Sequence, residues 1–367
     1  MAVSDPRVVI THDYLETYGG AERVTMEMAA AFPEAPVVSI LGRRAVAQRM
    51  GIGDRWRSVL PERERLLRQY RGMALVTPAI VDHHRVPEAD VVLSSSYAFA
   101  HRFGPHDGTA RVCYCHSPLR FAWSMTGEYR RRWARGPLSG AAFGAFAASM
   151  RSMDRRAAQR VDVYLTQSPY TAELILEAYG RRAEVIGAPV DCEVFQPAAG
   201  GDHGGYALLV GRMVEPYKRF DIVIEAFART GERLMIAGDG PARAELEAMA
   251  PPNATFLGHL EDAALVEAMQ RARYVVFPSR DDFGLVPLEA MACGRPVLAY
   301  DAGGARHTVV PGVTGERFPE QSADALEEAL HAFEPEAYDP GEIRRHAEHW
   351  DRRRFRARLR ERVLSAV

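Results

Sequence analysis

The strongest constraint on the fold is the regular alternation of short apolar runs with helix-like stretches along nearly the whole chain. Continuous apolar runs of four or five residues are typical of strands that are buried on both faces, and intervening helices connect parallel strands. We therefore expect an α/β protein with parallel sheets. The predicted strands are 7–11, 37–40, 90–94, 111–115, 161–165, 183–186, 206–210, 234–237, 274–277 and 296–299.

The chain length predicts two domains, because 367 residues exceed what a single hydrophobic core usually organises. Residues 198–205 contain four glycines and little apolar content, which is typical of a linker. We expect two Rossmann-like domains, 1–197 and 206–345, facing each other across a cleft. The Arg-rich stretch 346–367 predicts a C-terminal helix that packs back toward the N-terminal domain.

The composition limits which binding partners and which cellular compartment we expect for the protein. The formal net charge of −2 does not indicate bulk attraction to nucleic acid. No apolar run approaches the ~18 residues that a membrane span needs, and the N-terminus lacks a signal-peptide pattern. We expect a cytoplasmic protein, with peripheral contact to the inner face of the membrane left open. Cys113 and Cys115 lack metal-site spacing, so buried free thiols are the favoured interpretation of the cysteines.

Two cations follow the first strand of the second domain. Gly211 and Arg212 come directly after it, and Lys218 lies six residues beyond Arg212. Ligands of open α/β sheets bind outside the carboxyl ends of strands. Arg and Lys at this place can neutralise a diphosphate, while Gly211 lets the backbone approach it. The alternative is a solvated loop with two surface cations.

Two carboxylates flank a second turn. Asp281 precedes the turn Phe283-Gly284-Leu285, which opens a helix, and Glu289 lies within that helix. Backbone N–H groups at a helix N-terminus favour an anion. The two carboxylates could bind hydroxyls of two different sugars. The alternative is an ordinary helix cap and a helical Glu.

The first domain offers a glycine pair and a histidine. Gly19 and Gly20 open a helix after the first strand and permit close approach to phosphate or sugar. No G-x-G-x-x-G motif lies there, which argues against a nicotinamide dehydrogenase. His116 follows a predicted strand, and its ring can hydrogen-bond a sugar hydroxyl at neutral pH. A purely structural role is the alternative for each of these residues.

Two further glycine stretches end the second domain. Residues 303–307, Gly-Gly-Ala-Arg-His, follow another predicted strand and could also face the ligand. Gly312 and Gly315 are interpreted as turn residues.

Five features occur in an order that resembles the family 4 glycosyltransferases of the GT-B fold, over nearly the whole chain. They are residues 19–22 (GGAE), 114–118 (YCHSP), Gly211-Arg212 with Lys218-Arg219, 238–241 (GDGP), and 281–297 (DDFGLVPLEAMACGRPV). The resemblance implies a retaining hexosyltransferase that requires neither a metal nor another cofactor.

The resemblance also implies roles for individual residues, and the predicted catalytic residues are His116, Arg212, Lys218 and Asp281. Gly19 and Gly20 approach the donor, His116 lies near the transferred sugar, and Arg212 and Lys218 bind the diphosphate. Donor contacts are implied for Gly211, Asp281, Phe283, Gly284, Leu285 and Glu289, with Glu289 on the ribose and Asp281 on the transferred sugar. Asp281 stands where the family carries Glu, and it is one methylene shorter. His307 also departs from the family, which tends to carry Glu there.

The stretch 112–123 resembles a bacterial mannosyltransferase-like branch, so GDP-mannose is the first donor candidate, ahead of UDP-hexoses and other nucleotide sugars. The acceptor would be a glycan, a lipid-linked compound or a small molecule bound by the N-terminal domain. Basic and apolar residues in 130–135 and 138–160 fit either a membrane surface or, as we favour, a helix packed on the core. Two other functions stay open, a sugar-nucleotide epimerase and a non-catalytic nucleotide-sugar binding protein.

Overall fold

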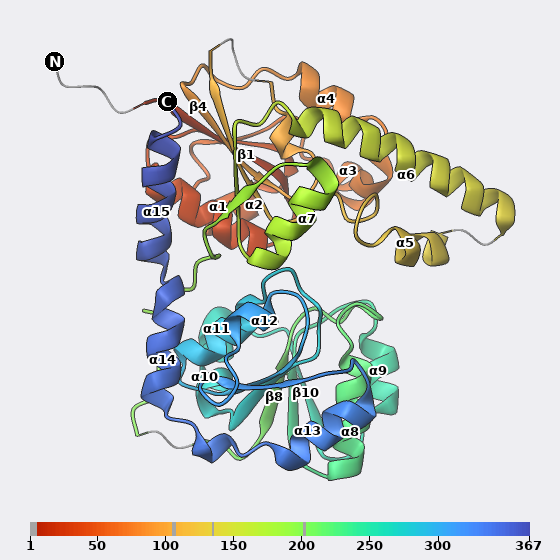
Figure 1. Ribbon diagram of the computed structural model, residues 1–367, viewed down its shortest axis with the longest axis vertical. Coiled ribbons are helices and arrows are strands. Elements are labelled where there is room, and N and C mark those ends of the chain that lie inside the picture. Colours follow the sequence, from red (N-terminus) through yellow and green to blue (C-terminus); the bar gives the residue numbers. More distant parts are fainter. Residues whose placement is uncertain (1–5, 105–107, 134–135, 201–202) are drawn as a thin grey trace. The chain divides into compact units, whose positions relative to one another are not determined.

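The computed structural model describes residues 6–104, 108–133, 136–200 and 203–367, and the chain divides into two compact units (Figure 1). Unit 1 comprises Met1–Pro189 and Phe355–Val367, and unit 2 comprises Val190–Arg354. Each unit has its own parallel sheet covered by helices, so the predicted α/β class is confirmed. Of the predicted linker 198–205, residues 201 and 202 lie outside the described ranges.

The sheet of unit 1 has seven described strands, all paired in parallel, in the order β3-β2-β1-β4-β5-β6-β7. Every residue of β1, β2 and β4 is buried, as expected for strands covered on both faces. The strands are β1 (Val8–Leu15), β2 (Val37–Gly42), β3 (Trp56–Ser58), β4 (Val91–Ser96), β5 (Ala110–Cys115), β6 (Val163–Thr166) and β7 (Ala183–Val185).

Most helices of unit 1 connect these strands along the chain, and the last one follows unit 2 in the sequence. They are α1 (Gly20–Ala31), α2 (Arg44–Arg49), α3 (Glu64–Gln69), η1 (Tyr70–Met73), α4 (Thr77–His83), η2 (Ala100–Arg102), α5 (Thr126–Trp133), α6 (Pro137–Ala158), α7 (Pro169–Tyr179) and, from residue 355 onward, α15 (Arg352–Leu364).

Helix α15 uses its arginines inside the protein. Phe355, Leu359 and Val363 recur at every fourth position and are buried. Arg356 forms an ion pair with the buried Glu27, and Arg360 donates a hydrogen bond to the carbonyl oxygen at the end of α1, at 3.2 Å. These contacts attach the last helix to α1.

Helix α6 is packed on the core of unit 1. Phe143 and Met150 are buried, and they are among the residues that would have entered a membrane interface. Arg151 and Arg155 donate to the carbonyl oxygens of Ala122 and Ala178, at 3.0 and 2.8 Å. These burials and contacts support the favoured packed helix. Residues 134 and 135, part of the basic stretch, lie outside the described ranges.

Unit 2 has a smaller sheet of six described strands in the order β10-β9-β8-β11-β12-β13, again all parallel. Figure 1 shows α8, α9 and α13 on one side of this sheet and α10, α11 and α14 on the other. The strands are β8 (Ala207–Val210), β9 (Leu234–Ala237), β10 (Ala254–Gly258), β11 (Tyr274–Phe277), β12 (Val297–Tyr300) and β13 (Gly315–Phe318). The helices are α8 (Phe220–Thr230), α9 (Arg243–Met249), α10 (Asp262–Arg271), α11 (Leu285–Ala292), α12 (Ala305–Thr308), α13 (Ala323–Ala332), η3 (Pro335–Ala337), α14 (Pro340–Ala347) and η4 (Glu348–Trp350).

The interpretation of Gly315 as a turn residue is wrong, because it begins β13 and pairs with Val297. Its φ of +145° is rarely adopted by residues with a side chain, and a Cβ there would lie 1.9 Å from the carbonyl oxygen of Val297. Gly315 therefore permits the close approach of β13 to β12. Gly312 also has a positive φ, +74°, but a Cβ there would meet nothing within 4 Å.

Substituting these two glycines should separate steric overlap from backbone strain. Gly315→Ala should lower the free energy of unfolding by more than ~2 kcal/mol, because the strand must move. Gly312→Ala, the matched control, should cost only about 1 kcal/mol for its left-handed backbone. Urea denaturation of both variants measures this. Equal losses would contradict the assigned role of Gly315.

Candidate active site

The strand order reverses once in each sheet, between β1 and β4 in unit 1 and between β8 and β11 in unit 2. Crevices at the carboxyl ends of such strand pairs are where open α/β sheets bind ligands. Gly211 and Arg212 follow β8, and Asp281 follows β11. The topology thus brings the two predicted motifs of the second half together.

The loop after β8 continues the sheet before it turns away. The N–H of Gly211 donates to the carbonyl oxygen of Ala237 at 3.0 Å, and that of Met213 donates to Asp239 at 3.0 Å. Met213 is buried, while the Arg212 side chain between them is exposed. The backbone is fixed and the guanidinium remains accessible, as a binding role for Arg212 requires.

Glycines after β9 allow this close packing. A Cβ on Gly238 would lie 1.9 Å from the carbonyl oxygen of Gly211, and one on Gly240 would lie 2.3 Å from that of Met213. The stretch 238–241 was identified from the sequence only as part of the family resemblance. Its glycines also support the loop that carries Arg212.

Lys218 and Asp281 form an ion pair, with Nζ 2.6 Å from Oδ2, although they lie 63 positions apart. Each side chain is 19% exposed, so the pair is partly shielded from water but can be reached by a ligand. Lys218 also lies over the ring of Tyr217, at 5.2 Å from its centroid. The structure therefore brings together two of the predicted catalytic residues.

Lys218 lies in the loop before helix α8. Helix α8 begins at Phe220, and Arg219 before it has a left-handed backbone with φ of 55°. The Glu215 carboxylate accepts hydrogen bonds from the N–H groups of Arg219 and Phe220, at 3.0 and 2.7 Å. Burial raises the pKa of Glu215. Sequence reasoning missed this carboxylate, which holds Lys218 in the loop.

The turn after β11 is held from its other side by Gly303 and Gly304. The N–H of Gly304 donates to the carbonyl oxygen of Asp281 at 2.8 Å. A Cβ on Gly303 would lie 2.2 Å from that same oxygen, and one on Gly304 would lie 2.3 Å from the Cα of Phe283. These two glycines therefore fix the loop that carries Asp281.

Helix α11 begins in this turn. Its N-cap is Gly284, with a φ of +85° and no side chain of its own to cap the first-turn amides. Phe283 is buried beneath the turn. Glu289 lies one turn into the helix and is only 4% exposed. A buried carboxylate therefore lies close behind a helix N-terminus that can bind an anion.

The glycine pair of unit 1 is also tied down. Helix α1 begins at Gly20, and the N–H of Gly19 donates to Glu22 Oε2 at 3.0 Å. The Glu22 carboxylate also lies 3.5 Å from Nε2 of His12. The Gly19 amide is thus occupied by its own helix.

His116 belongs to a buried hydrogen-bonded chain that the sequence did not reveal. Its Nε2 lies 2.8 Å from Ser95 Oγ. Ser95 Oγ lies 2.8 Å from Thr25 Oγ1 and 3.0 Å from His12 Nδ1. The chain thus runs from His116 through Ser95 and His12 to Glu22. Polar residues inside the apolar strands β1 and β4 were the available signal.

The His116 ring is neutral at physiological pH. Burial above all, and then His12, lowers its pKa to about 3. A neutral ring with Nε2 directed at Ser95 can serve as a hydrogen-bond partner but does not supply a positive charge.

Asp13 fixes the loop that follows β4. Its buried carboxylate accepts four backbone N–H groups, those of residues 97–100, at 2.6–2.9 Å. Tyr97 in this loop lies against both His12 and His116, with ring centroids 5.8 and 6.4 Å apart. Asp13 therefore fixes the position of Tyr97, whose ring lies against His116.

All four cysteines are buried, which agrees with the thiol interpretation. Burial above all, and then Glu289, raises the pKa of Cys293 to about 12. Within the described ranges, no cluster of three or more His, Cys, Asp or Glu is placed to hold a metal ion. The described part of the chain also contains no helix that is long and apolar enough to cross a membrane.

The low pKa of His116 predicts a loss of stability in acid. As the pH falls below the unfolded value near 6.5, the unfolded chain binds a proton that folded His116 does not bind. The contribution is therefore present above pH 6.5 and is lost toward pH 3, at up to about 1.4 kcal/mol per pH unit. Urea unfolding of His116→Gln between pH 6.5 and 4 should show a shallower pH dependence than the wild type. The exposed His331→Gln should keep the wild-type slope, and two identical slopes would disprove the assignment.

Comparison with known proteins identifies both halves. The family described as Glycosyltransferase Family 4 matches residues 18–194, and the family described as Glycosyl transferases group 1 matches residues 204–333. A D-inositol 3-phosphate glycosyltransferase of Kribbella flavida is 31% identical over 219 residues, 51% of each chain. A GDP-mannose-dependent monoacylated alpha-(1-6)-phosphatidylinositol monomannoside mannosyltransferase of Corynebacterium glutamicum is 31% identical over 206 residues, 48% of this chain and 54% of that one. The matches thus span about half the length of these relatives.

Solved structures extend the likeness to the whole fold. Anabaena Alr3699/HepE in complex with UDP has a TM-score of 0.73 at 17% identity, covering 98% of this chain and 100% of the other. A glycosyltransferase from Rickettsia africae has a TM-score of 0.65 at 14% identity, covering 98% of each chain. The chain has the GT-B fold and belongs to the family 4 glycosyltransferases.

Proposed function

We propose that the chain is a retaining, metal-independent hexosyltransferase that uses a nucleotide sugar, with GDP-mannose as the first candidate donor. The observation that carries this proposal is the Lys218–Asp281 ion pair at the reversal of strand order in unit 2. The loop that carries Lys218 also carries the exposed Arg212. Cations at strand ends suit a diphosphate. A carboxylate beside them suits the hydroxyls of a sugar.

The chemistry that such a site has to support is the departure of a diphosphate. The sugar carbon–oxygen bond breaks, and negative charge grows on the phosphate oxygens while the sugar becomes oxocarbenium-like. Arg212, Lys218 and the first-turn amides of α11 would stabilise that charge. Loss of one preorganised contact of this kind commonly costs ~10²–10³ in rate.

Asp281 would prepare Lys218 for this role. The 2.6 Å ion pair holds the ammonium at the strand ends before a donor arrives. Asp281 is one methylene shorter than Glu, and its carboxylate contacts the Lys218 ammonium. We propose that a bound donor shares Lys218 with Asp281, whose other oxygen then contacts the transferred sugar.

Glu289 would bind the ribose hydroxyls, since a buried carboxylate near a helix N-terminus can accept two hydroxyl hydrogen bonds. Gly211, Phe283, Gly284 and Leu285 would form the backbone surface on which the donor lies. The backbone packing of Gly303 and Gly304 supports this role, because it keeps the turn in place.

In unit 1, we propose that Gly19 and Gly20 approach the donor and that His116 contacts the transferred sugar. A neutral His116, held at Nε2 by Ser95, would act as a hydrogen-bond partner. For retention, a leaving-phosphate oxygen would accept the proton of the acceptor hydroxyl, while the new glycosidic bond forms on the face that the phosphate leaves. This route needs no protein nucleophile.

The donor proposal follows from the relatives. The Corynebacterium glutamicum protein is named as GDP-mannose-dependent, which supports GDP-mannose here. The Anabaena protein is described in complex with UDP-glucose, which keeps UDP-hexoses as the second choice. The acceptor would be a glycan, a lipid-linked compound or a small molecule. Asp281 stands where the family carries Glu. This departure favours one alternative function, a protein that binds nucleotide sugars without turnover.

A donor-cleavage assay tests the proposed function. The full chain is incubated in EDTA with GDP-mannose or UDP-glucose, with and without candidate acceptors, and release of the nucleoside diphosphate is measured. NMR of the glycosylated product then gives its anomeric configuration. Retention with one donor supports the proposal. Inversion, a need for metal, or donor binding without cleavage on any acceptor would each reject part of it, and formation of an epimer would indicate an epimerase.

Glu289→Gln should weaken nucleotide binding selectively. Its loss should lower the affinity for GDP about tenfold, because a hydrogen bond to a charged group contributes roughly 1.5–3 kcal/mol. The affinity for pyrophosphate, which has no ribose, should be unchanged in calorimetric titrations. The exposed Glu267→Gln serves as the control and should leave both affinities at wild-type values. An equal loss for GDP and pyrophosphate would refute the ribose contact.

A further inference from the structure

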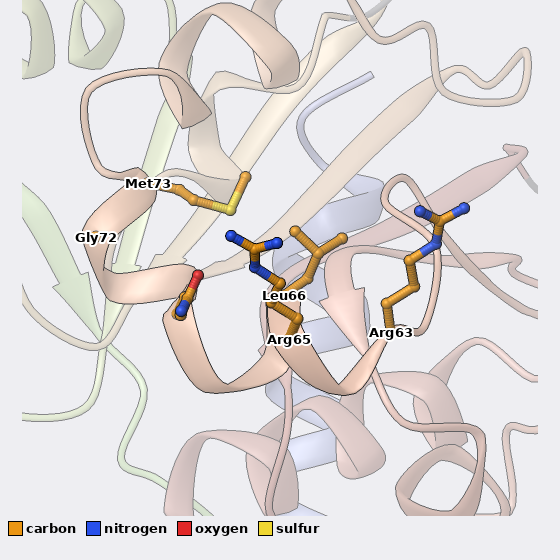
Figure 2. A pocket seen from close by; sticks show the side chains of 6 residues that line it. Arg63, Arg65, Leu66, Gly72 and Met73 are labelled. Atoms are coloured by element: carbon orange, nitrogen blue, oxygen red, sulfur yellow. The ribbon is translucent and has the colours of Figure 1, made fainter.

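A pocket of about 800 Å³ lies in the segment that follows β3 in unit 1 (Figure 2). This volume lies within the range that small-ligand sites usually have. None of the motifs that indicated the glycosyltransferase family falls in this segment. The residues that line the pocket are Arg63, Arg65, Leu66, Gln69, Gly72 and Met73.

The pocket lies at the functional edge of the unit 1 sheet. Because β3 is parallel to its neighbours, the segment after Ser58 starts at the carboxyl edge, where Gly19 and His116 also follow their strands. A row of rings links the two places. Tyr70 lies 4.4 Å from Tyr14, Tyr14 lies 6.5 Å from Tyr97, and Tyr97 lies 6.4 Å from His116.

The pocket carries uncompensated positive charge. Arg63 and Arg65 are exposed, and neither has an ion-pair partner among the described residues. The adjacent Glu64 binds Arg43 and Arg68, at 3.0 and 3.1 Å, and the Arg43 hydrogen bond above all lowers the pKa of this carboxyl. Two guanidinium groups at one pocket therefore favour an anion, and their planar forks match the oxygens of a phosphate.

The same pocket has an apolar part. Leu66 and Met73 line it, and Figure 2 shows the Leu66 and Met73 side chains near the guanidinium of Arg65. The chain then continues into Leu75 and Val76, which are 66% and 51% exposed. An inorganic anion would use only the arginines. The lining fits a ligand that joins a phosphate to an apolar group.

We propose that this pocket binds a phosphate-bearing amphiphile, with Arg63 and Arg65 on the phosphate and Leu66 and Met73 against the apolar part. The proposal deepens the proposed function, on which it rests, by naming the class of acceptor. The Gln69 amide, which also lines the pocket, can hydrogen-bond a hydroxyl of the ligand. The ligand comes either from a membrane surface or from solution, since both sources present the same chemistry.

Direct binding tests the pocket without a donor or turnover, so the result is independent of the proposed function. Dihexanoyl phosphatidic acid, kept below its micelle concentration, is titrated into the full chain in a calorimeter. Arg63→Gln and Arg65→Gln should each weaken binding about tenfold, because each removes a charge-assisted contact. Met73→Gln should weaken binding of this amphiphile but leave binding of inorganic phosphate unchanged.

The matched control is Arg131→Gln/Arg182→Gln, which removes two exposed arginines outside the pocket. It should bind like the wild type, whereas Arg63→Gln/Arg65→Gln should bind far more weakly. Sedimentation with phosphatidylcholine vesicles, with and without phosphatidic acid, distinguishes the sources. Arginine-dependent binding only to vesicles containing phosphatidic acid identifies a membrane ligand, and binding only to the short-chain lipid identifies a soluble one. Absence of both, or equal losses in the two double variants, would overturn the proposal.

Discussion

Backbone-to-backbone packing between strand-end loops is the constraint on which the unit 2 site depends. The backbone of Gly238 packs so close to that of Gly211 that a Cβ would not fit between them, and the backbone of Gly303 packs in the same way against Asp281. One contact fixes the loop that carries Arg212, and the other fixes the loop that carries Asp281. The Lys218–Asp281 ion pair forms because both loops end at the reversal of strand order. Charges held in this way need little reorganisation when a charged ligand arrives, and this preorganisation makes electrostatic catalysis effective.

The predicted catalytic residue of unit 1, His116, differs from those of unit 2 because it is buried. His116 is held by Ser95, and the chain of hydrogen bonds continues through His12 to Glu22 at the glycine turn. Buried polar groups are costly unless they are paired, so such a chain fixes the ring in one orientation. The position of Gly19 and that of His116 are thus set by one connected network. A substitution at Ser95 would therefore disturb both.

The parallel α/β architecture could be predicted because strands buried on both faces leave continuous apolar runs. Three strands were missed because they are partly exposed and carry no such run: β3 (Trp56–Ser58), β10 (Ala254–Gly258) and β13 (Gly315–Phe318). The strand-end residues Arg212, Lys218 and Asp281 could be found from their position after apolar runs. Glu215 and Gly315 could not, because their roles depend on contacts between segments: Glu215 caps a loop through backbone hydrogen bonds, and Gly315 is required by its distance to β12. No sequence motif marks the arginine pocket after β3, so the pocket could be identified only in the folded chain.

The central claim is that Arg212 and Lys218 form a diphosphate site that works without metal. The most direct test is calorimetric titration with GDP, UDP and ADP in EDTA. The titration compares the full wild-type chain with the double variant Arg212→Gln/Lys218→Gln. We predict that one nucleoside diphosphate binds the wild type in EDTA and that the double variant loses at least about a hundredfold in affinity, since two charge-assisted contacts are removed. The exposed Arg271→Gln should bind normally. Unchanged affinity in the double variant, or binding only after a divalent metal is added, would contradict the account.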